Sequence, residues 1–180
     1  MATTSIFNHL DGHGFEEKVC DILEEADLGI ASLQPLSNDY GIDIVLITPD
    51  SRRIGIQCKH TSKRVGRPTL QNLLGASAGR NFHEIWVITS NDFSHYAEEF
   101  ADEMNQTGRY PIIELIDGYT LGKMYRENRI QEQNYRKNIF EELDDFIYSN
   151  TQKNTTEPDY KLICLVLIVA FIMFKIVTPY

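Results

Sequence analysis

The chain has 180 residues, of which 42% are hydrophobic and 24% are charged, a composition typical of a folded domain rather than of a disordered chain. Its formal net charge of −9 argues against a uniformly basic protein that binds nucleic acid without specificity. Three widely spaced cysteines without a CxxC pair argue against a disulfide framework or a cysteine zinc cluster, and they fit a reducing compartment.

The first predicted element is a helix that ends near Gly29. Apolar residues recur on one helical face at Phe15, Val19, Ile22, Leu23 and Ala26. Just before it, His9 and His13 flank Asp11, a spacing also seen in zinc sites. No HExxH motif or cysteine partner accompanies them. We therefore interpret Asp11 as part of a helix start.

Two strands, 42–48 and 54–59, are predicted next, after a short irregular stretch and with a turn at 49–51. Both are almost wholly apolar, yet they contain Asp43, Gln57 and Lys59. A buried charge without a partner costs several kcal/mol, or its pKa changes until the group is neutral. These three groups must therefore meet suitable partners in the fold.

The rest of the chain alternates between helices and strands. A helix is expected at 68–80, a strand at 84–89, a helix capped by Ser94 and ended by Gly108, and a strand at 111–116. A charged helix follows, from about residue 121 to about residue 148. Apolar strands alternating with helices predict an α/β fold with a mixed sheet covered on both faces.

The C-terminal part of the chain reads as a linker, 149–159, followed by a hydrophobic segment, 160–180. The apolar run 162–174 rises only about 20 Å as a helix, which favours a buried helix. Counted from Tyr160 to Tyr180, a helix spans about 30 Å, and Lys161 and Lys175 suit the two interfaces. We therefore expect a C-terminal membrane anchor, with a core or dimerisation helix as the alternative.

The charges of the chain are distributed unevenly. Residues 51–83 contain seven Lys or Arg and no Asp or Glu. A local basic face is compatible with a phosphate-bearing ligand, while an ordinary solvated surface is the simpler interpretation. The basic residues that we expect to contact the phosphates of such a ligand are Arg52, Arg53, Lys63, Arg64 and Arg67.

One group of polar residues in the sequence is suited to metal binding and catalysis. Gln57 and Lys59 point to the same face of their strand, and Asp43 lies on the neighbouring strand. Glu16 sits at the edge of the buried stripe of the first helix, from which it can reach the same place. Hard oxygen ligands beside an ammonium group suit Mg²⁺. The alternative is a structural ion pair between Lys59 and Asp43.

The pattern DYGIDIVL…IGIQCKH resembles the D-x-G-I-D…Q-x-K signature of the Mrr-type (type IV) restriction endonucleases, a branch of the PD-(D/E)xK nuclease superfamily. The segments GHGFEEKVCDIL, VGRPTLQNLLGASAG, VITSNDFSHYAEEFADE and IIELIDGYTL are also similar to this family, in the same order. Tyr40 stands where the family often has a second glycine, whereas Gly41 is retained. The resemblance covers roughly residues 10 to 125.

The resemblance implies a restriction-endonuclease-like fold and metal-dependent hydrolysis of DNA phosphodiester bonds. Asp43 would be the main metal ligand, Gln57 would occupy the second acidic position, and Lys59 would be the catalytic lysine. Glu16 would be the accessory acid of the first helix, and Asp39 matches the earlier acid of the motif. Ser90 and Ser94 lack convincing histidine and acid partners, so an acyl-transfer triad is not expected.

The expected organisation is a nuclease domain at 1–125, a charged helical extension at 126–148, the linker and the hydrophobic segment. We expect a Mg²⁺-dependent DNA endonuclease in restriction or defence, placed in the cytoplasm because no secretory signal is visible. Cutting both strands of a duplex favours a homodimer or repeated nicking. The alternative is a catalytically idle DNA-binding or membrane-associated module, an interpretation that the neutral Gln57 keeps open.

Overall fold

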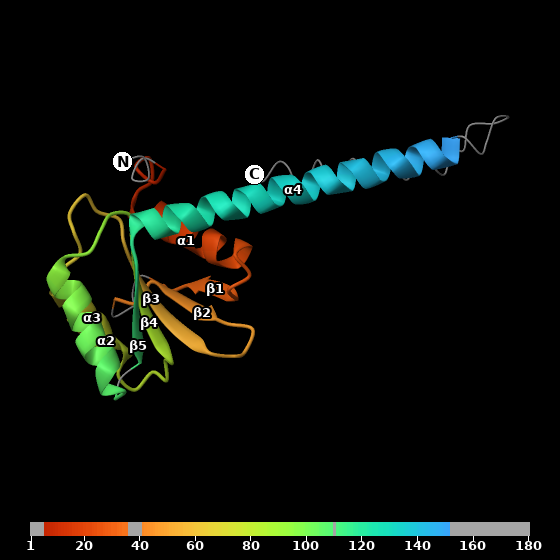
Figure 1. Ribbon diagram of the computed structural model, residues 1–180. Helices are drawn as coiled ribbons and strands as arrows, with labels where there is room; N and C mark the ends of the chain where they lie inside the picture. The colour runs from red at the N-terminus through yellow and green to blue at the C-terminus, as the bar shows by residue number, and fades with distance from the viewer. Residues whose placement is uncertain (1–5, 36–40, 110, 152–180) are drawn as a thin grey trace. The chain divides into compact units, whose positions relative to one another are not determined.

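The computed structural model describes residues 6–35, 41–109 and 111–151. In these ranges a five-stranded sheet is flanked by helices on both faces (Figure 1). The helices are α1 (Gly12–Glu25), α2 (Arg67–Ser77), α3 (His95–Thr107) and α4 (Gly118–Thr151), and the strands are β1 (Ile30–Leu33), β2 (Ile44–Ile47), β3 (Arg53–Lys59), β4 (Glu84–Thr89) and β5 (Ile112–Ile116).

The sheet is mixed, as the alternation of elements predicts. Its strand order is β1-β2-β3-β4-β5, with antiparallel pairing from β1 to β3 and parallel pairing from β3 to β5. The predicted turn between β2 and β3 is present, because the Ser51 amide donates to the Thr48 carbonyl at 2.8 Å. Strand β3 therefore has an antiparallel neighbour on one side and a parallel neighbour on the other.

Two hydrophobic cores lie on opposite faces of the sheet. On one face, Phe15, Val19 and Ile22 of α1 pack with Ile54 and Ile56 of β3. The other core is formed by α2, α3 and the same sheet, and it contains Leu70, Leu73, Ile85, Val87 and Phe100. Figure 1 shows α1 and the pair α2 and α3 on opposite sides of the strands. The expectation of a sheet covered on both faces is confirmed.

Several helix ends follow the signals in the sequence. Asp11 is the N-cap of α1 and accepts a hydrogen bond from the Gly14 amide at 2.7 Å. Ser94 caps α3 in the same way, and Gly108 ends it in the left-handed conformation with φ of 61°. These caps confirm the interpretation of Asp11 and the predicted limits of α3.

Four expectations about elements are wrong. Helix α1 ends at Glu25 rather than near Gly29. The stretch before the hairpin is not irregular, because β1 forms there and pairs with β2. Helix α2 ends at Ser77 rather than at residue 80, since the chain reaches a left-handed Gly79 directly afterwards. Helix α4 begins at Gly118 and continues to Thr151, past the start of the expected linker at 149.

The chain divides into two compact units, Met1–Ile130 and Gln131–Tyr180. In the second unit, α4 is charged as predicted, with an ion pair between Lys137 and Glu141 at 3.7 Å. The rest of the expected linker and the expected membrane anchor at 160–180 lie outside the described residues. Within the described ranges, no helix combines the length and the apolarity that a bilayer crossing requires.

Candidate active site

Lys59 lies at the carboxyl end of the parallel half of the sheet. It is the last residue of β3, and it is in register with Thr89, the last residue of β4. Ligands of open α/β sheets bind beyond the carboxyl ends of such strands. The Lys59 carbonyl accepts hydrogen bonds from the Ser90 amide at 3.1 Å and from Thr89 Oγ1 at 2.9 Å. The backbone that presents the lysine is therefore held from the neighbouring strand.

Asp43 directly precedes β2 and lies against β3. Its amide donates to the Ile56 carbonyl at 2.8 Å, and its Oδ2 accepts from the Cys58 amide at 2.7 Å. Cys58 separates Gln57 from Lys59 in the sequence. The structure thus brings the Asp43 carboxylate to the short segment that carries both other predicted residues.

Gln57 is a buried polar residue with one atom that lacks a partner. Its side chain is 7% exposed, and within the described ranges no group hydrogen-bonds its Oε1. A Cβ atom added at Gly41 would lie 2.9 Å from Gln57 Nε2, so the amide is packed directly against this glycine. Buried polar atoms are nearly always hydrogen-bonded, and an exception calls for an explanation such as a bound ion or water.

Glu16 approaches the same end of the sheet from α1. Its side chain is half-buried, and its Oε2 lies 3.5 Å from His13 Nδ1. The preceding residue, Phe15, stacks on the ring of His60 with 5.1 Å between the ring centroids. Because His60 follows Lys59, this contact joins the first turns of α1 to the end of β3.

The pKa of the Cys58 thiol depends on the charged groups around it. Burial raises the pKa of Cys58 well above its usual value, the Asp43 and Glu16 carboxylates raise it further, and the Lys59 ammonium opposes them. All three charges therefore act on one buried sulfur atom. Burial, followed by nearby carboxylates, also raises the pKa of Cys20 to about 12. Both thiols stay protonated near neutral pH, so neither is an activated nucleophile.

The donor set fits a hard divalent cation. Asp43 and Glu16 supply carboxylate oxygens, and Gln57 supplies the amide oxygen that lacks a partner. In the part of the chain that the structure describes, no three His, Cys, Asp or Glu side chains form a metal-binding cluster. A cation here would therefore depend on the Gln57 amide. Asp39 lies outside the described residues.

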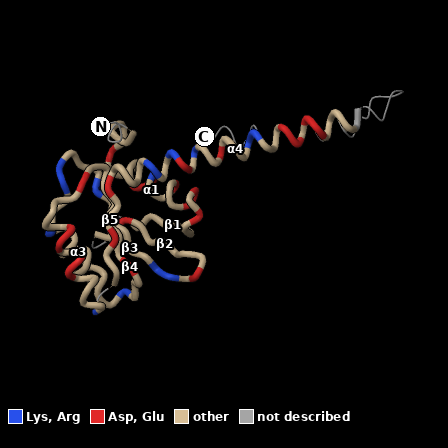
Figure 2. Tube along the Cα trace, viewed as in Figure 1, with Lys and Arg blue, Asp and Glu red and all other residues tan. Residues whose placement is uncertain are grey.

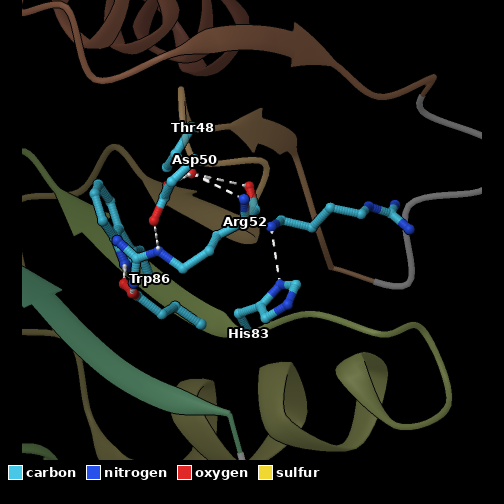
Figure 3. A network of polar contacts seen from close by, with 7 residues as sticks. Thr48, Asp50, Arg52, His83 and Trp86 are labelled. Atoms are coloured by element: carbon cyan, nitrogen blue, oxygen red, sulfur yellow. Dashed lines mark hydrogen bonds and ion pairs between the residues drawn. The ribbon is translucent and has the colours of Figure 1, made fainter.

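Two of the expected DNA-contacting residues lie at the opposite end of β3. Arg53 begins the strand that Lys59 ends, and six residue steps amount to about 20 Å. Arg52 forms ion pairs with Asp50, at 2.9 Å, and with Glu84 (Figure 3). The structure therefore does not bring Arg52 and Arg53 together with Lys59.

The other three expected DNA-contacting residues follow Lys59. Lys63 and Arg64 are exposed in the loop after β3, and Arg67 begins α2. Arg64 pairs with Asp92 at 3.3 Å, and the Arg67 guanidinium lies 4.7 Å from the centre of the Phe100 ring. Figure 2 shows how basic and acidic segments are distributed along the chain. The acid-free segment is thus split into two basic groups at different ends of the sheet.

Ser90 has a histidine neighbour that the sequence did not reveal, whereas the expectation that it does not form an acyl-transfer triad stays a prediction. His60 Nδ1 lies 3.0 Å from Ser90 Oγ, and the Thr61 amide donates to the same oxygen at 3.1 Å. Ser90 is only 3% exposed, so the pair is not an accessible nucleophile and its base. Separation by thirty residues hid this contact. The one available signal was the polar pair Thr89-Ser90 at the end of an apolar strand.

Comparisons with known protein sequences find restriction endonucleases. A family model for the Mrr catalytic domain, described as "Restriction endonuclease", matches residues 7–125. The type IV methyl-directed restriction enzyme EcoKMrr of Escherichia coli (strain K12) is 31% identical over 122 residues, which cover 64% of this chain. The match spans 38% of the length of that relative.

A solved structure shows the same fold. The chain resembles the MspJI restriction endonuclease in complex with a 27-mer oligonucleotide, with a TM-score of 0.50 and 19% sequence identity. The match covers 90% of this chain and 38% of that one. At this level of identity the likeness concerns the fold alone.

Proposed function

The chain belongs to the Mrr-type family of restriction endonucleases, and from this membership we propose that it is a divalent-metal-dependent endonuclease that hydrolyses DNA phosphodiester bonds. The observation that carries the proposal is Gln57 Oε1, which is buried and has no hydrogen-bond partner in the described part of the chain. It lies on the same short segment as the Cys58 amide that binds Asp43. A bound cation would give this oxygen a ligand partner, and it would balance the negative charge of the neighbouring carboxylates.

Each residue has a distinct role in the proposal. Asp43, Gln57 and Glu16 hold the cation, which we assign as Mg²⁺ because all three offer hard oxygen ligands. When bound, Mg²⁺ lowers the pKa of a coordinated water and neutralises charge on the phosphate. The Lys59 ammonium orients the attacking water and stabilises the charge that develops on the phosphate oxygens. The Asp43 carboxylate is preoriented for its role by the Cys58 amide.

DNA is positioned by the basic residues that follow Lys59. Lys63, Arg64 and Arg67 lie at the carboxyl end of β3, where phosphate contacts would direct the backbone toward the candidate site. One chain carries one such site, so cutting both strands requires a homodimer or two successive nicks. We assign the nuclease to residues 1–125 and treat α4 beyond them as an extension of this domain.

The test is cleavage of supercoiled plasmid by the purified full chain, with and without Mg²⁺. We expect nicking that requires the metal. Asp43→Asn and Lys59→Ala should each lower the rate on the order of 10²–10³-fold, the usual cost of removing one group that stabilises transition-state charge.

The matched controls are Asp102→Asn on α3 and Lys123→Ala on α4, which change the same chemical groups on helices that carry none of the proposed site residues. Both should cut at the unsubstituted rate. If the full chain binds DNA but does not cut it at any Mg²⁺ concentration, the proposal is wrong and the idle DNA-binding module is the better description.

A further inference from the structure

At the end of β3, hydrogen bonds from side chains add to the backbone bond between the Ser90 amide and the Lys59 carbonyl. The ladder between β3 and β4 ends at Lys59 and Thr89. Beyond it, Thr89 Oγ1 donates to the Lys59 carbonyl at 2.9 Å, and the Thr61 amide donates to Ser90 Oγ at 3.1 Å. Thr89 is fully buried and Ser90 is 3% exposed, so these hydroxyls compete little with water.

His60 extends these bonds to the helix layer. Its Nδ1 lies 3.0 Å from Ser90 Oγ, and its ring stacks on Phe15 with an interplanar angle of 26°. The Ser90 hydroxyl also donates to the Thr61 carbonyl at 3.4 Å, so one buried hydroxyl contacts both the His60 ring and the Thr61 backbone.

We propose that Ser90 and His60 are positioning residues that fix the Lys59 end of β3 against the helix that carries Glu16. The chain of contacts is continuous. Ser90 contacts His60, and His60 stacks on Phe15. In the sequence, His60 directly follows Lys59, and Phe15 directly precedes Glu16. The inference rests on the proposed function, because it assigns these residues to the alignment of that site.

A purely structural role would be simpler, since buried serines often satisfy nearby backbone groups. That role accounts for the bond from the Thr61 amide. Ser90 also contacts His60, which is half-buried. The His60 ring stacks on Phe15 of α1, so this contact links the sheet to the helix layer. Misplacement of a catalytic group by about 1 Å can cost about 100-fold in rate, so such a link matters for catalysis.

The experiment is a double-mutant cycle in the full chain, with Ser90→Ala, His60→Phe and the double variant. His60→Phe keeps an aromatic ring for Phe15 and removes the nitrogen that contacts Ser90. Two quantities are measured: the single-turnover rate of plasmid cleavage, and the Mn²⁺ concentration that half-saturates the protein without DNA. Ser77→Ala is the matched control, because Ser77 is 4% exposed and donates to the Leu74 carbonyl within α2.

We expect each single variant to slow cleavage about tenfold or more and to raise the half-saturating Mn²⁺ concentration about tenfold, as loss of an outer-shell partner of a metal site does. The double variant should lose no more than the worse single variant, since both remove the same contact. Ser77→Ala should lower the melting temperature without changing either quantity.

Two outcomes overturn the inference. One is unchanged cleavage and Mn²⁺ binding in Ser90→Ala and His60→Phe, with only the melting temperature lowered as in Ser77→Ala. The other is additive losses in the double variant, which would show that the two residues act separately. If the unsubstituted chain binds Mn²⁺ without cutting DNA, the proposed function fails, and the shift in half-saturation still decides the role of Ser90 and His60.

Discussion

Gly41 is the residue whose absence of a side chain matters most for the candidate site. Its φ of +85° lies in the region that L-residues rarely adopt. In addition, an added Cβ would lie 2.9 Å from Gln57 Nε2. The glycine between Asp39 and Asp43 in the family signature therefore has two separable physical roles. It permits the backbone turn, and it leaves room for the buried Gln57 amide.

Gly41→Ala should impair both stability and cleavage. The positive φ alone costs about 1–2 kcal/mol for an alanine, and the new methyl group must also displace the Gln57 amide. Gly79→Ala is the matched control, because Gly79 has a φ of +73° and its added Cβ meets nothing within 4 Å. Chemical denaturation and plasmid nicking measure the two effects. We expect similar losses of stability but a loss of cleavage only in Gly41→Ala. Equal cleavage by the two variants would contradict the role of Gly41 in placing Gln57.

At the scale of elements, the two ends of β3 have different surroundings. Its carboxyl end presents Lys59, whereas its start belongs to a network of polar contacts at the β2–β3 turn. There, Arg52 pairs with Asp50 and Glu84, and Trp86 Nε1 donates to Glu84 Oε2 at 2.8 Å (Figure 3). Charges committed to such a network hold strands together and are poorly available for phosphate. We therefore propose that the basic residues of this segment divide into a structural group and a group that contacts DNA.

Arg64→Ala and Arg52→Ala test this division, since each arginine has an aspartate partner in the free protein. Arg64→Ala should weaken duplex binding and reduce the slope of log K against log salt by about 0.9, the value for one lost phosphate contact. Arg52→Ala should leave that slope unchanged and lower the melting temperature. Binding is measured without divalent metal, so that no cleavage occurs. An equal change of slope in both variants would show that DNA also reaches the turn end of the sheet.

Most elements could be predicted from the sequence because their signals are local. Helix α1 follows from its apolar face, and Asp11, Ser94 and Gly108 mark helix ends by chemistry that acts within four residues. Strand β1 was missed because it has only four residues, and exposed and half-buried positions alternate along it. Such an edge strand is defined by its pairing with β2, a contact that no local pattern reveals.

The candidate site was predictable only in part, for a related reason. Asp43, Gln57 and Lys59 lie on two strands joined by a tight turn, so alternation and pairing suffice to bring them together. Contacts between distant segments stayed hidden, as the bond between His60 and Ser90 shows. The prediction that Arg52 lies near Lys59 was wrong for a different reason. The two residues are close in the sequence, but the extended strand β3 separates them in space.

At the scale of the whole molecule, the cores belong to the first unit. The buried hydrophobic residues in the described ranges all lie between Phe7 and Leu121. The side chains of Met124 and Tyr125 add partly buried contacts to the core around α1. The first unit ends at Ile130, shortly after the last of these contacts. Burial of apolar surface is the main favourable term in folding, so the first unit contains the interactions that stabilise this fold.

A chain that ends at Ile130 should therefore fold and nick plasmid as the full chain does, with a melting temperature within a few degrees. A chain that ends at Asp117 is the matched comparison, because it lacks the buried Leu121. Loss of one buried leucine costs about 2–5 kcal/mol, which corresponds to a lowering of the melting temperature by roughly 6–25 °C in a domain of this size. Thermal unfolding followed by circular dichroism measures both. If the chain ending at Ile130 is unfolded, the second unit contributes to the stability of the first.

The position of β3 in the middle of the sheet also affects how the protein is inactivated by heat. This strand is paired on both sides, with β2 and β4, and its residues Ile54 and Ile56 are covered in the core around α1. Segments of this kind open to solvent only in the rarest fluctuations, those that approach global unfolding. We therefore expect the amide hydrogens of Ile56 and Cys58 to be among the slowest to exchange. The backbone that carries Gln57 and Lys59 would then persist until the fold itself is lost, and heat inactivation would be all-or-none rather than gradual.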